Sequence, residues 1–179
     1  EASDGVGGDF ATLTLAAADY NIKQQTGPVV FSLIDDTYPG ETFPIVFNEN
    51  AGSSETNTIT IKPASGKTPV ISGSSSQALI KLYGADYFII DGSNGAKGTD
   101  RSLTFANTYT SFSGTSSSIW LAGASAGAGC HHVTVKNCKL TSGYNSSGYY
   151  IVFFAGGNTI GSDGYDHDFL TLDNNELYN

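Results

Sequence analysis

The segment Val133-Thr134-Val135-Lys136-Asn137 decides the fold, because the same five-residue unit recurs along the chain. Each clear copy has an apolar residue, a Thr or Ser, a second apolar residue, a variable residue and then a residue suited to a turn. The two-residue period predicts a short strand with one apolar face, and the last residue predicts a tight turn. The clearest copies cover residues 31–35, 59–63, 103–107, 133–137 and 170–174.

Looser copies fall between these units, most of them about 10 to 19 residues apart; they begin at Ile45, Val70, Ile80, Phe88, Ile119 and Ile151. A sandwich of hairpins would need many two-residue turns, but Asp91-Gly92 is the one Asx-Gly pair in a candidate turn near strands. A solenoid explains the spacing better, because each coil contributes two or three short strands and loops project from its corners. The sequence therefore predicts an all-β fold, a single right-handed parallel β-helix.

The N-terminal region differs from the repeats. Thr12 is placed to cap a helix over residues 13–24, which hold Ala16, Ala17, Ala18 and Ile22. A short amphipathic helix of this kind would cover the apolar cross-section of the first coil, as the ends of solenoids require. We therefore expect one domain over residues 1–179, with an N-terminal cap at 1–27 and coils at 28–179.

Two sets of motifs resemble known β-helices. Residues 8–13 (Gly-Asp-Phe-Ala-Thr-Leu), the expected helix, and residues 27–31 and 36–41 resemble the opening of pectin-lyase-like right-handed β-helices. Residues 59–63 and 88–92 resemble the β-helix repeats of large secreted bacterial surface proteins. The resemblance covers nearly the whole chain and implies the fold, whereas its motifs form strands and turns and do not identify an activity.

Composition narrows the classes of partner. The net charge is −9, and the eight Lys and Arg residues are scattered, which argues against binding to nucleic acid. No stretch of 18 apolar residues is present, so no membrane span is expected. The chain contains no Met and opens at Glu1, as expected of a mature secreted product trimmed of a leader, although an arbitrary boundary would look the same.

Cys130 and Cys138 are the two cysteines. In an extended chain their Cα atoms would lie about 23 Å apart, against about 5.5 Å in a disulfide. They can pair only if the segment folds back, so two reduced thiols packed among strands are the favoured interpretation.

Enzymes of the pectin-lyase-like class provide the patterns for a catalytic site. Lyases of this kind use calcium-binding carboxylates and an Arg or Lys base, and the single Arg, Arg101, follows Asp100 in a loop-like stretch. A loop ion pair is the favoured interpretation of Arg101. Hydrolysis needs an acid and a base at a set separation, but Asp35 and Asp36 are adjacent in a turn and would point to opposite faces of a strand. We predict no catalytic residue.

Asp163, Asp166 and Asp168 form the densest acidic cluster. Three carboxylates in a Gly-containing loop can coordinate calcium, the one cofactor that we consider, while a solvated turn is the favoured alternative.

His131 and His132 precede a strand, where neighbours face opposite sides and cannot share one metal ion. We therefore expect one surface His beside a partly buried one.

The aromatic run at residues 149–154 supplies a candidate binding surface. Alternation places Tyr149, Ile151 and Phe153 on one face, and Tyr150, Val152 and Phe154 on the other. One set can fill the core, while the other either forms an exposed row for a glycan or a partner, or is covered by a loop.

The C-terminal end bears on function. Leu177 and Tyr178 begin another strand, and no capping segment follows residues 170–174. An open coil exposes unpaired backbone groups, which natural proteins seldom leave unprotected. Three explanations remain: the chain is a fragment of a longer solenoid, a loop folds back as a cap, or another molecule docks there. We favour docking between copies, and hence a non-enzymatic extracellular structural or adhesive module that assembles end to end into a filament. The alternative is a carbohydrate-active enzyme or a glycan-binding domain.

Overall fold

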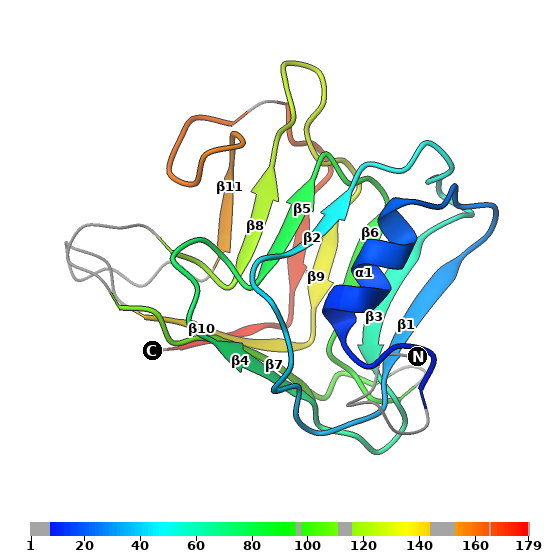
Figure 1. Ribbon diagram of the computed structural model, residues 1–179, viewed down its shortest axis with the longest axis vertical. Coiled ribbons are helices and arrows are strands. Elements are labelled where there is room, and N and C mark those ends of the chain that lie inside the picture. The colour runs from blue at the N-terminus through cyan, green and yellow to red at the C-terminus, as the bar shows by residue number, and fades with distance from the viewer. Residues whose placement is uncertain (1–7, 96–97, 111–115, 144–152, 165, 179) are drawn as a thin grey trace.

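The computed structural model describes residues 8–95, 98–110, 116–143, 153–164 and 166–178, which form a parallel β-solenoid with one short helix (Figure 1). Sheet A consists of β1 (Val29–Leu33), β3 (Ile59–Pro63), β6 (Phe88–Asp91), β9 (Thr134–Lys136) and β12 (Thr171–Asp173). Sheet B consists of β4 (Val70–Gly73), β7 (Leu103–Asn107), β10 (Cys138–Ser142) and β13 (Glu176–Tyr178). Sheet C consists of β2 (Ile45–Asn48), β5 (Ile80–Tyr83), β8 (Ile119–Ala122) and β11 (Phe153–Gly156).

Each coil runs through sheet A, sheet B and sheet C before the chain returns to sheet A one level further along. The ten strand pairings among the described residues are all parallel. In the first coil Thr37 takes the place of a sheet B strand, through a parallel bridge to Val70. This arrangement confirms the predicted solenoid.

Side chains of the repeated unit form continuous columns inside the coils. Ile61, Ile90, Val135 and Leu172 occupy equivalent positions in successive sheet A strands, and the first three are fully buried. Thr60, Thr134 and Thr171 lie on the outer face, as predicted. Leu172 is 54 % exposed, because β12 has no neighbouring strand on its far side among the described residues.

Asn137 and Asn174 occupy equivalent corners, as predicted. Both have left-handed backbones, with φ of 57° and 49°, which Asn tolerates better than most residues. The Asn174 amide donates to Asn137 Oδ1 and the Asn137 amide donates to Asp91 Oδ1, each at 2.8 Å. The corner at Asn137 is so tight that β10 begins at the next residue, and the sequence prediction missed that strand.

Helix α1 (Leu13–Asn21) covers the first coil and packs against β2 (Figure 1). The Thr12 side chain accepts a hydrogen bond from the amide of Leu15 at 3.0 Å, which confirms the predicted cap. The carboxylate of Glu41 accepts the amides of Leu13 and Thr14 at 2.7 and 2.8 Å. The helix ends at Asn21, three residues earlier than the predicted residue 24. None of the described helical residues forms a segment that could cross a membrane.

Candidate functional site

The end of the stack that carries β12 and β13 exposes apolar side chains that elsewhere would fill the core. Leu172 and Leu177 continue inward-facing columns of sheets A and B, yet they are 54 % and 57 % exposed. Together with Phe153 of sheet C they surround a hollow of about 230 Å³. We call this surface the tail hollow; its lining residues are Leu140, Phe153, Leu172, Asn174, Asn175 and Leu177.

Helix α1, at the opposite end, is apolar on two sides. Its inner side buries Leu13, Ala16, Ala17 and Tyr20. Its outer side presents Leu15 at 52 % and, just past its last residue, Ile22 at 82 % exposure, with Ala18 exposed between them. The spacing of three and then four residues places these side chains along one face. This helix stripe (Leu15, Ala18 and Ile22) departs from the predicted amphipathic pattern, in which the outer face would be polar.

A second surface lies at the turns that lead into sheet A. Tyr87, His132 and Phe169 each directly precede the corresponding unit of sheet A, and all three have φ between 53° and 55°. Their rings stack with centroids 4.6 and 4.5 Å apart and interplanar angles of 7° and 3°. We call these three rings the corner stack.

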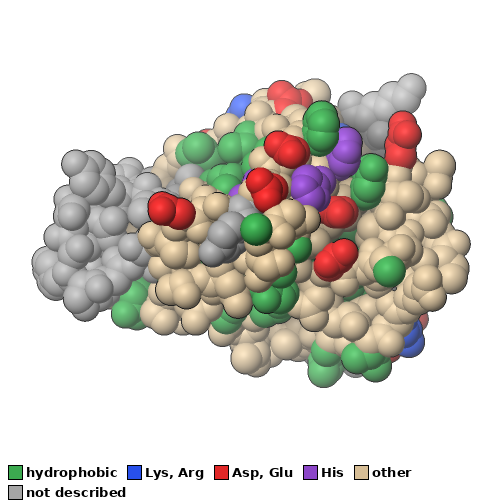
Figure 2. All heavy atoms as spheres, turned by 90° about the horizontal axis from the view of Figure 1, so that it is seen from above, with side chains coloured by type: hydrophobic (Ala, Val, Ile, Leu, Met, Phe, Trp, Pro, Cys, Tyr) green, Lys and Arg blue, Asp and Glu red, His purple; other side chains and the backbone are tan. Residues whose placement is uncertain are grey.

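The corner stack borders a pocket of about 340 Å³. This corner pocket is lined by Glu55, Thr58, Tyr87, Ile89, His132 and Thr134. Figure 2 looks onto these turns and shows His side chains among Asp and Glu side chains, while Lys and Arg side chains appear only toward the margins of the visible described surface.

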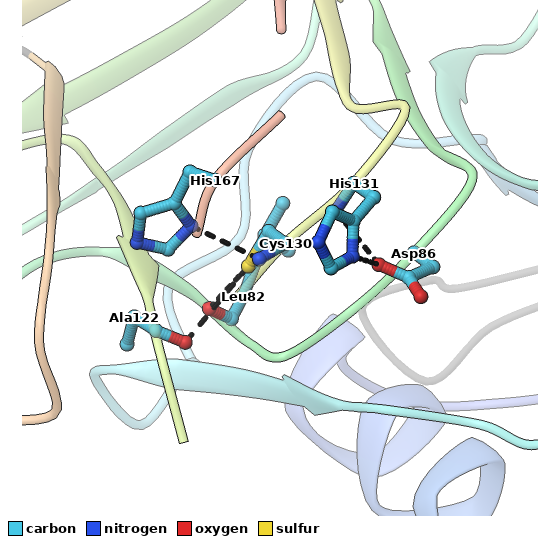
Figure 3. Close-up of polar contacts among 6 residues, drawn as sticks. All are labelled: Leu82, Asp86, Ala122, Cys130, His131 and His167. Carbon is cyan, nitrogen blue, oxygen red and sulfur yellow. Dashed lines mark hydrogen bonds and ion pairs between the residues drawn. The ribbon is translucent and has the colours of Figure 1, made fainter. Parts of the chain in front are cut away.

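His131 and His167 hold neighbouring turns together (Figure 3). Asp86 Oδ1 lies 2.9 Å from His131 Nδ1 and accepts the His131 amide at 2.7 Å. His167 Nδ1 accepts the amide of Cys130 at 2.9 Å, and its Nε2 lies 2.9 Å from the carbonyl oxygen of Gly156. Because a carbonyl can only accept, the proton of a neutral His167 is on Nε2. His131 is partly buried and His132 is exposed, as expected.

The pair Cys130 and His167 does not form a nucleophile with its base. The imidazole contacts the backbone of Cys130, while the thiol donates to the carbonyl of Leu82 at 3.3 Å. Burial raises the pKa of Cys130 to about 12, and burial likewise raises the pKa of Cys138 to about 12. A nucleophilic cysteine needs a lowered pKa. Both cysteines are free and buried, in agreement with the sequence interpretation.

Arg101 and Asp36, which were weighed against the catalytic patterns, make contacts that join coils. Arg101 donates from Nε and Nη2 to the carbonyl and side-chain oxygens of Asn174, both at 2.7 Å. The predicted loop ion pair is therefore wrong, because the guanidinium reaches past the neighbouring coil and bonds at the turn between β12 and β13. Asp36 accepts the amide of Thr68 at 2.9 Å and lies 3.9 Å from Lys67, so it also ties two coils together.

The calcium candidates lie in the loop after β11. Asp166 accepts the amide of Gly127 at 2.6 Å, and Asp168 forms a parallel bridge with His131. Within the described ranges, which include Asp163, no three His, Cys, Asp or Glu side chains gather as a metal site. Calcium binding stays a prediction.

The outer face of sheet C carries a small second core. Trp120 is buried there with Ala78 and Ala122, and Phe154 and Ile160 pack against them. The ammonium group of Lys81 lies 4.1 Å from the centroid of the Trp120 ring, and burial lowers its pKa. Phe153 faces the main core, so the predicted alternation holds for Phe153 and Phe154. Ile160 belongs to the loop after β11, so a loop covers this part of the row; residues 149–152 lie outside the described residues.

The sequence prediction missed the stacking of Tyr87 on His132, the pocket residue Glu55 and the contact of Glu41 with the helix. A signal for the corner stack was present, because aligning the repeated units places Thr58, Tyr87, His132 and Phe169 in one column. Glu41 gave no comparable signal, because it lies more than 25 residues further along the sequence than the helix residues whose amides it accepts.

Comparisons of the chain with models of protein families, with curated proteins and with solved structures found no match.

Proposed function

We propose that this chain is a non-enzymatic extracellular module with a structural or adhesive role, whose copies associate head to tail. One observation carries the proposal: exposed apolar surfaces lie at both ends of the stack, the helix stripe at one end and the tail hollow at the other. The extracellular location rests on the composition and on the resemblance to β-helix repeats of secreted bacterial surface proteins.

The two surfaces are complementary in shape. The helix stripe is a ridge, since Leu15 and Ile22 project from a helix that packs against β2 through its other side. The tail hollow is concave, and Leu172, Leu177 and Phe153 supply its apolar wall. An apolar helix face that docks into an apolar groove is a common mode of protein recognition. Each Leu or Ile side chain that becomes buried contributes about 1.5–3 kcal/mol before the costs of association.

A contact between two different surfaces has a consequence for assembly. Every open assembly still presents one free helix stripe at one end and one free tail hollow at the other, so the contact does not saturate itself. Such a contact produces a ring if its rotation closes and a filament if it does not. The stacking direction of the coils favours a linear filament.

The experiment uses two blocking variants. Ile22→Asp removes the ridge and Leu177→Asp charges the hollow, and both positions are more than half exposed, so the fold should persist. We expect concentration-dependent oligomers of the unaltered chain and monomers of each variant, measured by light scattering and sedimentation. An equimolar mixture of the two variants should form a 1:1 dimer and nothing larger, because it retains one good stripe and one good hollow.

Val70→Asp is the matched control, since Val70 is exposed on the flank of the stack in β4. It should assemble like the unaltered chain. If Ile22→Asp alone dimerises, the contact joins two like ends and the head-to-tail proposal is wrong. A monomeric unaltered chain at about 1 mM would also contradict the proposal.

A further inference from the structure

Tyr87 is the first ring of the corner stack. One face of its ring is covered by His132, whose ring is nearly parallel to it at 4.6 Å. The strand register continues from Phe88 and Ile59 back to Tyr87 and Thr58, so the opposite face of the ring points toward Thr58 in the preceding coil. Thr58 is too small to continue the stack, and the corner pocket occupies this region.

The groups around the pocket favour a positively charged ligand. Glu55 is exposed and supplies a carboxylate, Tyr87 supplies an aromatic face, and Ile89 supplies an apolar floor. A cation is attracted to an aromatic face and to a carboxylate together, and an anion is disfavoured by both. The surrounding turns are rich in acidic side chains (Figure 2), and the whole chain has a net charge of −9.

The lysines of β3 and β9, two of the strands that follow the corner pocket, are not among the residues that line it. Lys62 and Lys136 come later in their strands, and Lys136 lies 3.3 Å from Asp91 in an ion pair. Glu55 is the acidic residue of the lining, and no lysine is among the lining residues. The volume of about 340 Å³ is near the lower end of the roughly 300–1,000 Å³ typical of ligand pockets.

We infer that the corner pocket binds a small organic ammonium ion, with its methyl or methylene groups on the free face of Tyr87 and its charge beside Glu55. The thermodynamic reason is that stacking buries apolar surface while the carboxylate compensates the ligand's charge. This binding is independent of head-to-tail association, since the pocket belongs to the turns before β3, β6 and β9 rather than to the helix stripe or the tail hollow.

Choline and its uncharged carbon isostere, 3,3-dimethylbutan-1-ol, are the probes. We expect choline to shift the backbone amide resonances of Thr58, Tyr87 and His132 in a saturable titration of ¹⁵N-labelled protein. The isostere should bind at least about tenfold more weakly, because it has the same shape without the charge. Glu55→Gln should weaken choline binding about tenfold and leave the affinity for the isostere unchanged.

Glu49→Gln is the matched control, because Glu49 is exposed in the same loop but does not line the pocket. It should bind choline normally. Tyr87→Phe should retain binding because it keeps the ring, whereas Tyr87→Leu should lose it. The inference is overturned if the isostere binds as well as choline, if Glu55→Gln has no effect, or if no saturation appears up to about 20 mM choline.

Discussion

Single residues with left-handed backbones determine where this chain turns. Tyr87, His132 and Phe169 all have positive φ, as do Asn137 and Asn174 at the next corner. A non-glycine residue in this region costs roughly 1–2 kcal/mol, so neighbouring coils must offset that cost. Ring stacking does so at the first corner, and amide hydrogen bonds do so at the second.

The two corners differ in how far they could be predicted. Asn tolerates the left-handed region and often ends a strand, so the role of Asn137 and Asn174 followed from the sequence. Nothing local favours a left-handed Tyr or Phe, although His is enriched there. The contacts that hold Tyr87 and His132 come from coils more than 35 residues apart in the chain, and they appear only once the register is known.

Asn137 offers a test at the scale of one residue. Asn137→Gly keeps the favourable backbone but removes the bonds to Asp91 and Asn174, whereas Asn137→Ala removes the bonds and also strains the backbone. We expect both variants to lower the free energy of unfolding, Asn137→Ala by about 1 kcal/mol more than Asn137→Gly. Urea titrations followed by circular dichroism measure the difference. Equal losses would show that φ at this corner adds no strain for Ala.

At the scale of strands, the repeated unit matches the register of β3, β6, β9 and β12, whereas β1 and β11 pair two residues away from the aligned positions. The inward and outward faces of β3 and β9 followed from alternation alone. Strand β10 was missed because Asn137 looked like the end of a unit, and a turn of one residue leaves no loop to mark a second strand. The helix stripe was missed because a cap was expected to be polar outside.

Strand β9 offers a test of register with its own control. Val135 is fully buried, and its neighbour Thr134 lies on the outer face. Val135→Asp places an unpaired carboxylate in an apolar core, which costs several kcal/mol, so we expect an unfolded chain. Thr134→Asp should fold with a cooperative melting transition, as seen by circular dichroism. Cooperative folding of Val135→Asp would mean that the register is wrong.

At the scale of the whole molecule, the solenoid is a row of coils in which the strands of each coil pair only with strands of the neighbouring coils. Such a row is stabilised from both sides in its middle and from one side at its ends. One end is covered by α1, while β12 and β13 at the other end have every residue exposed. Local stability should therefore fall toward β12 and β13, even though all coils repeat the same sequence unit.

Hydrogen exchange tests this gradient and the proposed association together. In a dilute sample we expect the slowest amide exchange in β3 and β6, which lie between other strands of sheet A, and the fastest in β12 and β13. At high concentration, docking of a second copy should slow exchange in β12 and β13 and leave β3 and β6 unchanged, because bound partners protect only the surface that they cover. The Leu177→Asp variant should keep the dilute pattern at every concentration, and Val70→Asp should follow the unaltered chain.

If β12 and β13 exchange as slowly as β6 in the dilute sample, the tail hollow is not an open end. If exchange there does not change with concentration, the helix stripe of another copy does not occupy the hollow.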